Sequence, residues 1–109
     1  MAVTRQQVAE LYVATFNRAP DAAGLDYWVN DSGLTIEGIA QSFFDQPETQ
    51  TLYPAGTTNT AFVTAIYSNL FNRTPDAAGL AYWVAELNNA TMTRSVMIEA
   101  MKNGVFGTD

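Results

Sequence analysis

A stretch of 14 residues occurs twice in the chain, as FNRAPDAAGLDYWV at residues 16–29 and as FNRTPDAAGLAYWV at residues 71–84. When residues 8–29 are aligned with residues 63–84, fourteen of the twenty-two positions are identical. Self-similarity of this kind indicates one structural unit present twice, and neither unit buries its apolar side chains alone. The repeat therefore predicts two copies of one unit packed around a shared core.

Apolar side chains in each repeat have the spacing of three amphipathic helices. In the first repeat, Thr4 and Gln7 have the spacing of a capping box, which predicts a helix from Thr4 to about Asn17. Two more helices are predicted over residues 21–30 and 35–45, the last one closed by Pro47. The first helix is expected to bury Val8, Leu11, Tyr12, Thr15 and Phe16 and to turn Arg5, Gln6 and Glu10 toward water.

The second repeat has the same three segments. Asn59 is the predicted cap of its first helix, and its last helix is predicted to start at Thr93 and to stop at Gly104. Residues 46–58, between the repeats, have the composition of a linking loop with one helical turn over residues 48–52.

We therefore predict an all-α fold in one domain, residues 1–109, made of two repeats, 4–53 and 59–106, joined by a Pro/Gly/Thr loop. The two tandem three-helix repeats are expected to pack as a pseudo-twofold, six-helix bundle-like domain. The linking loop also permits exchange of one half between two chains, so both a monomer and a homodimer are compatible with the sequence.

Charge and composition exclude several classes of function. Five Lys and Arg against eleven Asp and Glu give a net charge of −6, which argues against nucleic acid and anionic lipid as partners. The chain has no Cys and no His, so thiolate or imidazole metal sites and Ser-His-Asp triads are excluded. No apolar run approaches the ~20 residues of a membrane span, and no cleavable signal peptide is visible.

The repeated turn is the first candidate site. Each copy carries an Asn and an Asp four residues apart, whose oxygens are of the kind that Ca²⁺ accepts. In the other interpretation the Asp caps a helix, the Asn satisfies turn carbonyls and the neighbouring Arg pairs or stacks on an aromatic ring. The calcium candidates are Asn17 and Asp21 in the first copy and Asn72 and Asp76 in the second.

The residues common to both copies are interpreted as structural. The Pro-Asp turn starts a helix, the Gly admits a close backbone or Trp ring, and the Tyr-Trp pair fills the core. The alternative for the aromatic residues is a platform for a sugar or a groove for a partner. The structural set is Arg18, Pro20, Asp21, Gly24, Tyr27 and Trp28 with Arg73, Pro75, Asp76, Gly79, Tyr82 and Trp83; the expected ligand surface, where the copies differ, is Asp26, Asp31 and Tyr53.

Catalysis has little support in the sequence. Glycoside hydrolysis needs a matched pair of carboxyl groups, and no pair stands apart among the scattered acids of this chain. We therefore expect no enzymatic activity, and the alternative is a small carbohydrate-active enzyme that uses its carboxylates.

The phrases LYVATFNRAPDAAGLDYWV and IYSNLFNRTPDAAGLAYWV resemble the helical repeat domain of unknown function found in bacterial surface-layer proteins and in secreted hemolysin-type calcium-binding repeat (RTX) proteins. Their pattern is also similar to that of phycobilisome linker domains. The resemblance implies a non-enzymatic N-terminal module that anchors or assembles an extracellular protein on the bacterial surface, exported by type I secretion without a signal peptide.

The partners that this resemblance implies are envelope polysaccharide or neighbouring protein subunits. A protein-protein adaptor of the phycobilisome-linker kind is the alternative. The Gly- and Asp-rich nonapeptide repeats that bind calcium in RTX proteins are absent from this chain. We therefore expect no cofactor, with calcium left open.

Overall fold

The computed structural model describes residues 3–106, and its first helix, α1 (Arg5–Phe16), begins at the predicted capping box. The Gln7 N–H donates to Thr4 Oγ1 over 3.1 Å, and the Thr4 N–H donates to Gln7 Oε1 over 2.9 Å. The helix ends at Asn17, whose φ of 56° is left-handed, a conformation that Asn tolerates better than most residues. Both predicted ends of this helix are confirmed.

The second predicted helix is α-helical only at its start. It comprises α2 (Ala22–Asp26) followed by a π-helical turn, η1 (Tyr27–Asp31). Gly33 then adopts a φ of 69°, and Thr35 caps α3 (Ile36–Phe43). The boundaries were predictable from Gly and Thr, whereas no residue in the sequence marks the change to a π-turn.

Pro47 begins a helix as well as ending one. It occupies the first turn of α4 (Pro47–Leu52), where its missing N–H has no partner to lose. The turn predicted over residues 48–52 is thus a short helix. Residues 3–106 consequently form seven α-helices and one π-helical turn, and the predicted six-helix count omitted α4.

Thr58, not Asn59, caps α5 (Asn59–Phe71), because the Ala61 N–H donates to Thr58 Oγ1 over 3.1 Å. The Asn59 side chain instead accepts from Arg94 Nη2 over 3.0 Å. The predicted cap was therefore wrong by one residue.

The last two helices are α6 (Ala77–Asn88) and α7 (Arg94–Phe106). Thr93 caps α7 as predicted, with the Val96 N–H donating to Thr93 Oγ1 over 3.2 Å. Gly104 does not stop this helix, which continues through it. A helical Gly costs only about 1 kcal/mol relative to Ala, so Gly alone did not justify the predicted end.

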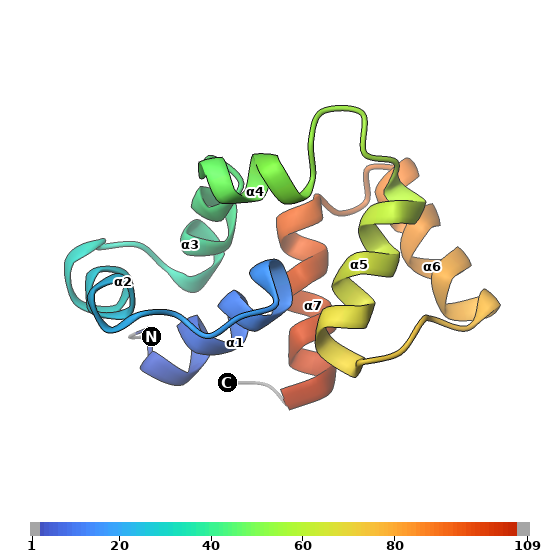
Figure 1. The fold of residues 1–109 in the computed structure, drawn as a ribbon. Helices are drawn as coiled ribbons and strands as arrows, with labels where there is room; N and C mark the ends of the chain where they lie inside the picture. The colour runs from blue at the N-terminus through green and yellow to red at the C-terminus, as the bar shows by residue number, and fades with distance from the viewer. Residues whose placement is uncertain (1–2, 107–109) are drawn as a thin grey trace.

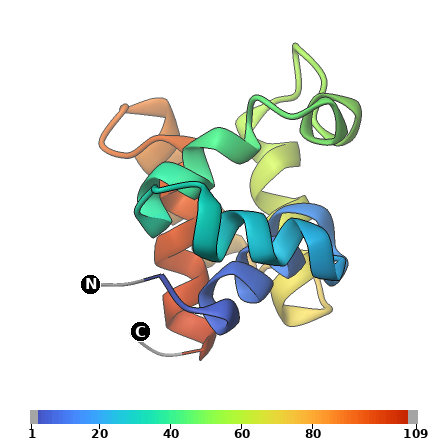
Figure 2. The same ribbon diagram turned by 90° about the vertical axis from the view of Figure 1, so that its left-hand side faces the viewer.

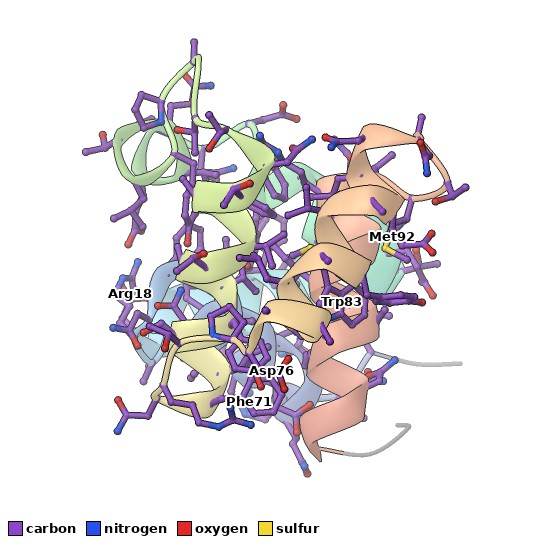
Figure 3. All side chains as sticks on the ribbon, turned by 90° about the vertical axis from the view of Figure 1, so that its right-hand side faces the viewer. Arg18, Phe71, Asp76, Trp83 and Met92 are labelled. Atoms are coloured by element: carbon purple, nitrogen blue, oxygen red, sulfur yellow. The ribbon has the colours of Figure 1, made fainter. Side chains whose placement is uncertain are left out.

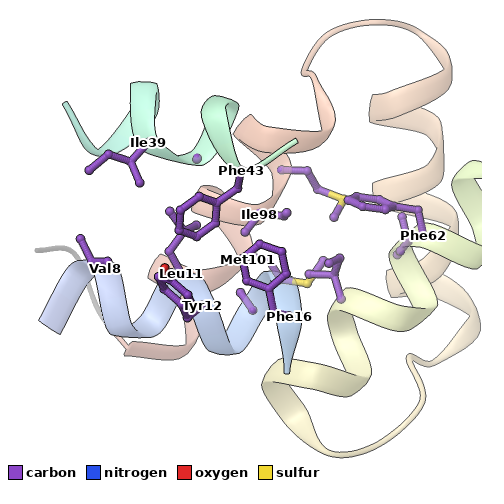
Figure 4. Packing of buried hydrophobic residues seen from close by; sticks show 14 residues of the cluster. Val8, Leu11, Tyr12, Phe16, Ile39, Phe43, Phe62, Ile98 and Met101 are labelled. Atoms are coloured by element: carbon purple, nitrogen blue, oxygen red, sulfur yellow. The ribbon is translucent and has the colours of Figure 1, made fainter. Parts of the chain in front are cut away.

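α7 packs on α1, α3 and α5, and in the view of Figure 1 it lies between α1 and α3 on one side and α5 on the other. Figure 2 shows the same arrangement from the side of α2. α1 packs on α5 and α3 packs on α7, so corresponding helices of the two repeats contact each other. α6 lies on the outside of α5 and buries no residue completely. The core (Figure 4) comprises Val8, Leu11, Tyr12, Ala14, Phe16, Ile39, Ala40, Phe43, Phe62, Val63, Ile66, Met97, Ile98 and Met101.

The interior also contains charged side chains. Lys102 in α7 is 1% exposed, and its Nζ lies 3.1 Å from Glu10 Oε1 in α1. Gln6 Nε2 donates to the other Glu10 oxygen over 2.9 Å. The prediction that Glu10 faces water was wrong, because α7 covers that side of α1. No helix among the described residues is long and apolar enough to cross a membrane.

Candidate functional site

The two copies of the repeated turn form the same helix cap. The Gly24 N–H donates to Asp21 Oδ1 over 2.7 Å, and the Gly79 N–H donates to Asp76 Oδ1 over the same distance. A carboxylate at this position satisfies an otherwise unpaired N–H and also interacts favourably with the helix dipole. The capping interpretation of both Asp residues is therefore correct.

Each glycine of the motif makes room for that carboxylate. A Cβ on Gly24 would lie 2.9 Å from Asp21 Oδ1 and 3.0 Å from the Tyr12 hydroxyl oxygen. A Cβ on Gly79 would lie 2.9 Å from Asp76 Oδ1. The close neighbour is thus the cap, and the expected backbone or Trp ring is not among the nearest atoms.

The calcium candidates have other roles in the structure. Asn17 and Asn72 each adopt a φ of 56° at the end of a helix, and Asp21 and Asp76 cap the helices that follow. Within residues 3–106, no three acidic side chains gather in a way that could hold a metal ion. Calcium binding at the turn remains a prediction, and it would have to draw on one carboxylate per copy.

The Tyr-Trp pairs divide between core and surface. Trp28 and Trp83 are partly buried and pack against the core, but Tyr27 is 50% exposed and Tyr82 is 54% exposed. Consecutive helical residues point about 100° apart, so only one member of each pair can face the core. The prediction of a core role was wrong for both Tyr residues.

A cavity of about 290 Å³ lies between the first copy of the motif and the start of α4. Aromatic rings form one side of it, and polar groups from the turn and from α4 form the other. Its lining residues are Tyr12, Phe16, Arg18, Trp28, Phe43, Gln46, Pro47 and Glu48. We call this the aromatic cavity.

Arg18 and Glu48 form the polar side of the aromatic cavity. Arg18 Nε donates to Glu48 Oε2 over 2.8 Å and Arg18 Nη2 donates to Glu48 Oε1 over 2.6 Å, a two-bond fork. These hydrogen bonds lower the pKa of the Glu48 carboxyl below its ordinary value and raise the pKa of Arg18. The pair therefore stays ionised, and its two charges cancel.

The same guanidinium lies over the aromatic wall. Arg18 Cζ is 5.3 Å from the centre of the Tyr12 ring and 5.6 Å from that of Phe16. Trp28 Nε1 donates to the Tyr12 hydroxyl over 3.1 Å, and the Trp28 ring lies 5.2 Å from the Phe43 ring. The wall is thus fixed by hydrogen bonding and packing.

The second copy has a different surrounding. Arg73 Cζ lies 5.2 Å from the Tyr67 ring centre and 5.7 Å from that of Phe71, as in the first copy. No ion pair of Arg73 is found among the described residues, and these residues end with α7, so no helix among them corresponds to α4. Figure 3 shows this copy, with Trp83 on the outer α6 and Met92 in the loop that follows it. The motif is therefore shared, but the Arg-Glu fork belongs to the first copy.

A second cavity, of about 300 Å³, lies on the other side of Phe16. Its lining consists mostly of uncharged polar and apolar side chains from α1, α4 and α5. The lining residues are Phe16, Asn17, Leu52, Tyr53, Ala65 and Asn69. We call this the amide cavity, after its two Asn side chains.

Tyr53 in the amide cavity is anchored. Its hydroxyl donates to the Thr15 carbonyl over 2.7 Å and accepts from Asn69 Nδ2 over 3.4 Å. Asn69 Nδ2 also donates to the Ala14 carbonyl over 2.9 Å, so both side chains satisfy carbonyls in the last turn of α1. Burial raises the pKa of Tyr53, and the Asn69 hydrogen bond opposes that shift.

The predicted ligand surface is not assembled as one site. Tyr53 lines the amide cavity, whereas Asp26 forms an exposed ion pair with Arg5 over 2.7 Å and Asp31 is exposed. Neither Asp lines the aromatic or the amide cavity. The residues that sequence reasoning missed are Gln46, Pro47 and Glu48, for which the only signal was that the segment has no copy in the second repeat.

A family model described as "Domain of unknown function (DUF4214)" matches residues 40–104, from the last turn of α3 to the last turn of α7. The match covers more than half of the chain. No curated protein and no solved structure matches it.

Proposed function

The chain belongs to the DUF4214 family, and we propose that it is a non-enzymatic carbohydrate-binding module that attaches an exported bacterial surface protein to envelope polysaccharide. The description of this family names no activity. The observation that supports the proposal is the aromatic cavity, which Trp28 lines together with the Arg18–Glu48 pair.

Both walls of this cavity suit a sugar ring. A pyranose has faces of C–H groups, which pack on aromatic rings such as Trp28, and an edge of hydroxyl groups, which need donors and acceptors. Arg18 supplies donors and Glu48 supplies acceptors in one plane, held in place before a ligand arrives. Fixed polar groups that orient a ligand beside apolar rings are a usual feature of a small-ligand site.

The same geometry favours binding over hydrolysis. Glycosidases of the two-carboxylate kind pair a general acid with a second carboxylate. Glu48 is the one carboxylate that lines the aromatic cavity, and Arg18 lowers its pKa, which makes it a poor proton donor near neutral pH. The carbohydrate-active enzyme is therefore the weaker alternative.

The cellular context of the proposal comes from the repeated motif. Its resemblance to repeats of surface-layer and RTX proteins supports an extracellular place on the bacterial surface and export without a cleaved signal peptide. The packing of α1 on α5 and of α3 on α7 supports the pseudo-twofold arrangement of two repeats. The acidic chain supplies little positive charge for a phycobilisome-like partner.

The test uses the second repeat as its control. Trp28→Ala and Trp83→Ala variants, each checked for folding by circular dichroism, are titrated calorimetrically with purified envelope polysaccharides. We expect Trp28→Ala to abolish binding and Trp83→Ala to retain it. If the wild-type protein binds none of these polysaccharides, or if both variants bind equally well, the proposal is wrong.

Intrinsic fluorescence gives a direct readout of the same site. The chain has two Trp residues, so Trp83→Phe leaves Trp28 as the only indole. We expect added polysaccharide to shift or quench its emission. The reciprocal Trp28→Phe variant should show no change in the emission of Trp83.

Contact with neighbouring subunits is the second candidate function, and the outer face of α6 favours it. Tyr82 is 54% exposed on a helix that buries no residue completely. Sedimentation equilibrium of the wild type and of Tyr82→Asp tests this candidate, which predicts an association that the charge removes. A wild type that stays monomeric at millimolar concentration would contradict it.

A further inference from the structure

Building on the proposed carbohydrate-binding function, we infer that the ligand is an uncharged glycan chain that occupies the aromatic and the amide cavity together. A single terminal sugar would fill only one of them. The inference comes from the positions of the two cavities along α4 and from the chemistry of their linings.

The two cavities share one rim. Phe16 lines both of them, and the next two residues divide between them, with Asn17 at the amide cavity and Arg18 at the aromatic cavity. The two cavities therefore adjoin each other at the end of α1, as a ligand that occupies both requires.

α4 connects the cavities along its length. Its first residues, Pro47 and Glu48, line the aromatic cavity, and its last residue, Leu52, lines the amide cavity. A helix of this length spans about 9 Å at ~1.5 Å per residue, so the cavities lie within reach of one short oligomer. No other helix among the described residues corresponds to α4, so this track occurs once in that part of the chain.

The charges favour a neutral glycan. In the aromatic cavity the charges of Arg18 and Glu48 compensate each other, and the amide cavity is lined by amides, a phenol and apolar groups. The protein carries a net charge of −6, which repels a polyanionic chain. Amides donate and accept hydrogen bonds at once, as hydroxyl groups of sugars require.

The test is a length series of uncharged sugars, from mono- to hexasaccharides of glucose, mannose, rhamnose and N-acetylglucosamine, titrated into the wild-type protein. We expect affinity to rise at least about tenfold from the monosaccharide to the oligomer that fills both cavities and then to level off. The affinity rises because a longer sugar makes contacts in the second cavity and loses its translational and rotational freedom only once.

Asn17→Gly and Asn72→Gly form the matched pair of variants. Gly accepts the left-handed backbone of both positions, so each change removes an amide and keeps the turn. We expect Asn17→Gly to lose the gain of the longer sugars without weakening the monosaccharide, and Asn72→Gly to behave as the wild type. Leu52→Ser, at the 48% exposed end of α4, should act like Asn17→Gly.

The outcomes separate the inference from the proposed function. Affinity that does not depend on length, with monosaccharide binding intact, overturns the inference and leaves the proposed function standing. If the protein prefers uronate oligomers and this binding weakens with added salt, the inference that the glycan is uncharged is wrong. Failure of every carbohydrate, neutral or acidic, overturns both.

Discussion

The ammonium nitrogen of Lys102 lies 3.1 Å from Glu10 Oε1, and this ion pair joins the last helix to the first in the interior of the protein. The side chains are 1% and 8% exposed. Glu99 Oε1 lies 3.9 Å from the same nitrogen. Charges this far from water persist only with partners, because their desolvation costs several kcal/mol each.

Removal of the Lys102 charge should therefore destabilise the fold strongly. We expect Lys102→Met to lower the free energy of unfolding by about 3–5 kcal/mol, since it leaves the Glu10 carboxylate buried without its cation. The double variant Glu10→Leu/Lys102→Met should regain much of that loss. Urea denaturation measures both, and a Lys102→Met variant as stable as the wild type would contradict the role of the pair.

The two helix caps should contribute equally. Asp21→Ala and Asp76→Ala are each expected to lower the unfolding free energy by about 1 kcal/mol, because each leaves a backbone N–H of the first helical turn without its acceptor. Asp21→Asn and Asp76→Asn are the controls, since Asn caps nearly as well. A melting temperature that rises with Ca²⁺ in the wild type and not in either Ala variant would instead favour a calcium site.

The two motif glycines should differ in their tolerance of Ala. Ala is a better helix former by about 1 kcal/mol, but its Cβ would displace the capping carboxylate at both sites. At Gly24 the Cβ would also meet the Tyr12 hydroxyl, which Trp28 holds in place. We expect Gly24→Ala to be the more destabilising in thermal unfolding, and equal stability of Gly24→Ala and Gly79→Ala would contradict that order.

The starts of most helices could be predicted from the sequence, because a single capping residue marks each of them. Thr4, Asp21, Thr35 and Asp76 cap helices where the sequence placed caps, and the buried stripe of α1 follows from its apolar spacing. Asn59 was misread because Thr58 beside it is an equally good cap.

The candidate site was less predictable because it depends on contacts between distant segments. Arg18 and Glu48 are 30 residues apart, and nothing in either local sequence pairs them. The sequence predicts that Lys102, a charged residue after the apolar Met101, faces water. The structure shows it buried, because α1 packs on α7. The spacing of apolar residues predicts one buried face for each helix. α1 is covered on two faces, because both α5 and α7 pack on it.

The Arg18–Glu48 pair should make stability depend on pH in the acidic range. The folded-state pKa of Glu48 lies below its unfolded value, so the contribution is complete above the unfolded pKa and is lost as the pH falls through the folded-state pKa. Both side chains are more than a third exposed, which limits the contribution to roughly 1 kcal/mol or less. Urea midpoints of the wild type and Glu48→Gln should differ at neutral pH and converge as the pH falls below the folded-state pKa of Glu48, and a constant difference would contradict the assignment.

The central place of α7 has a consequence for synthesis on the ribosome. The core side chains Met97, Ile98 and Met101 and the partner of Glu10 are among the last of the domain to be translated. α1 and α5 contact each other directly, but the core is incomplete until then, because α7 packs on α1, α3 and α5. The domain therefore completes its core only late in its translation, when α7 has been made.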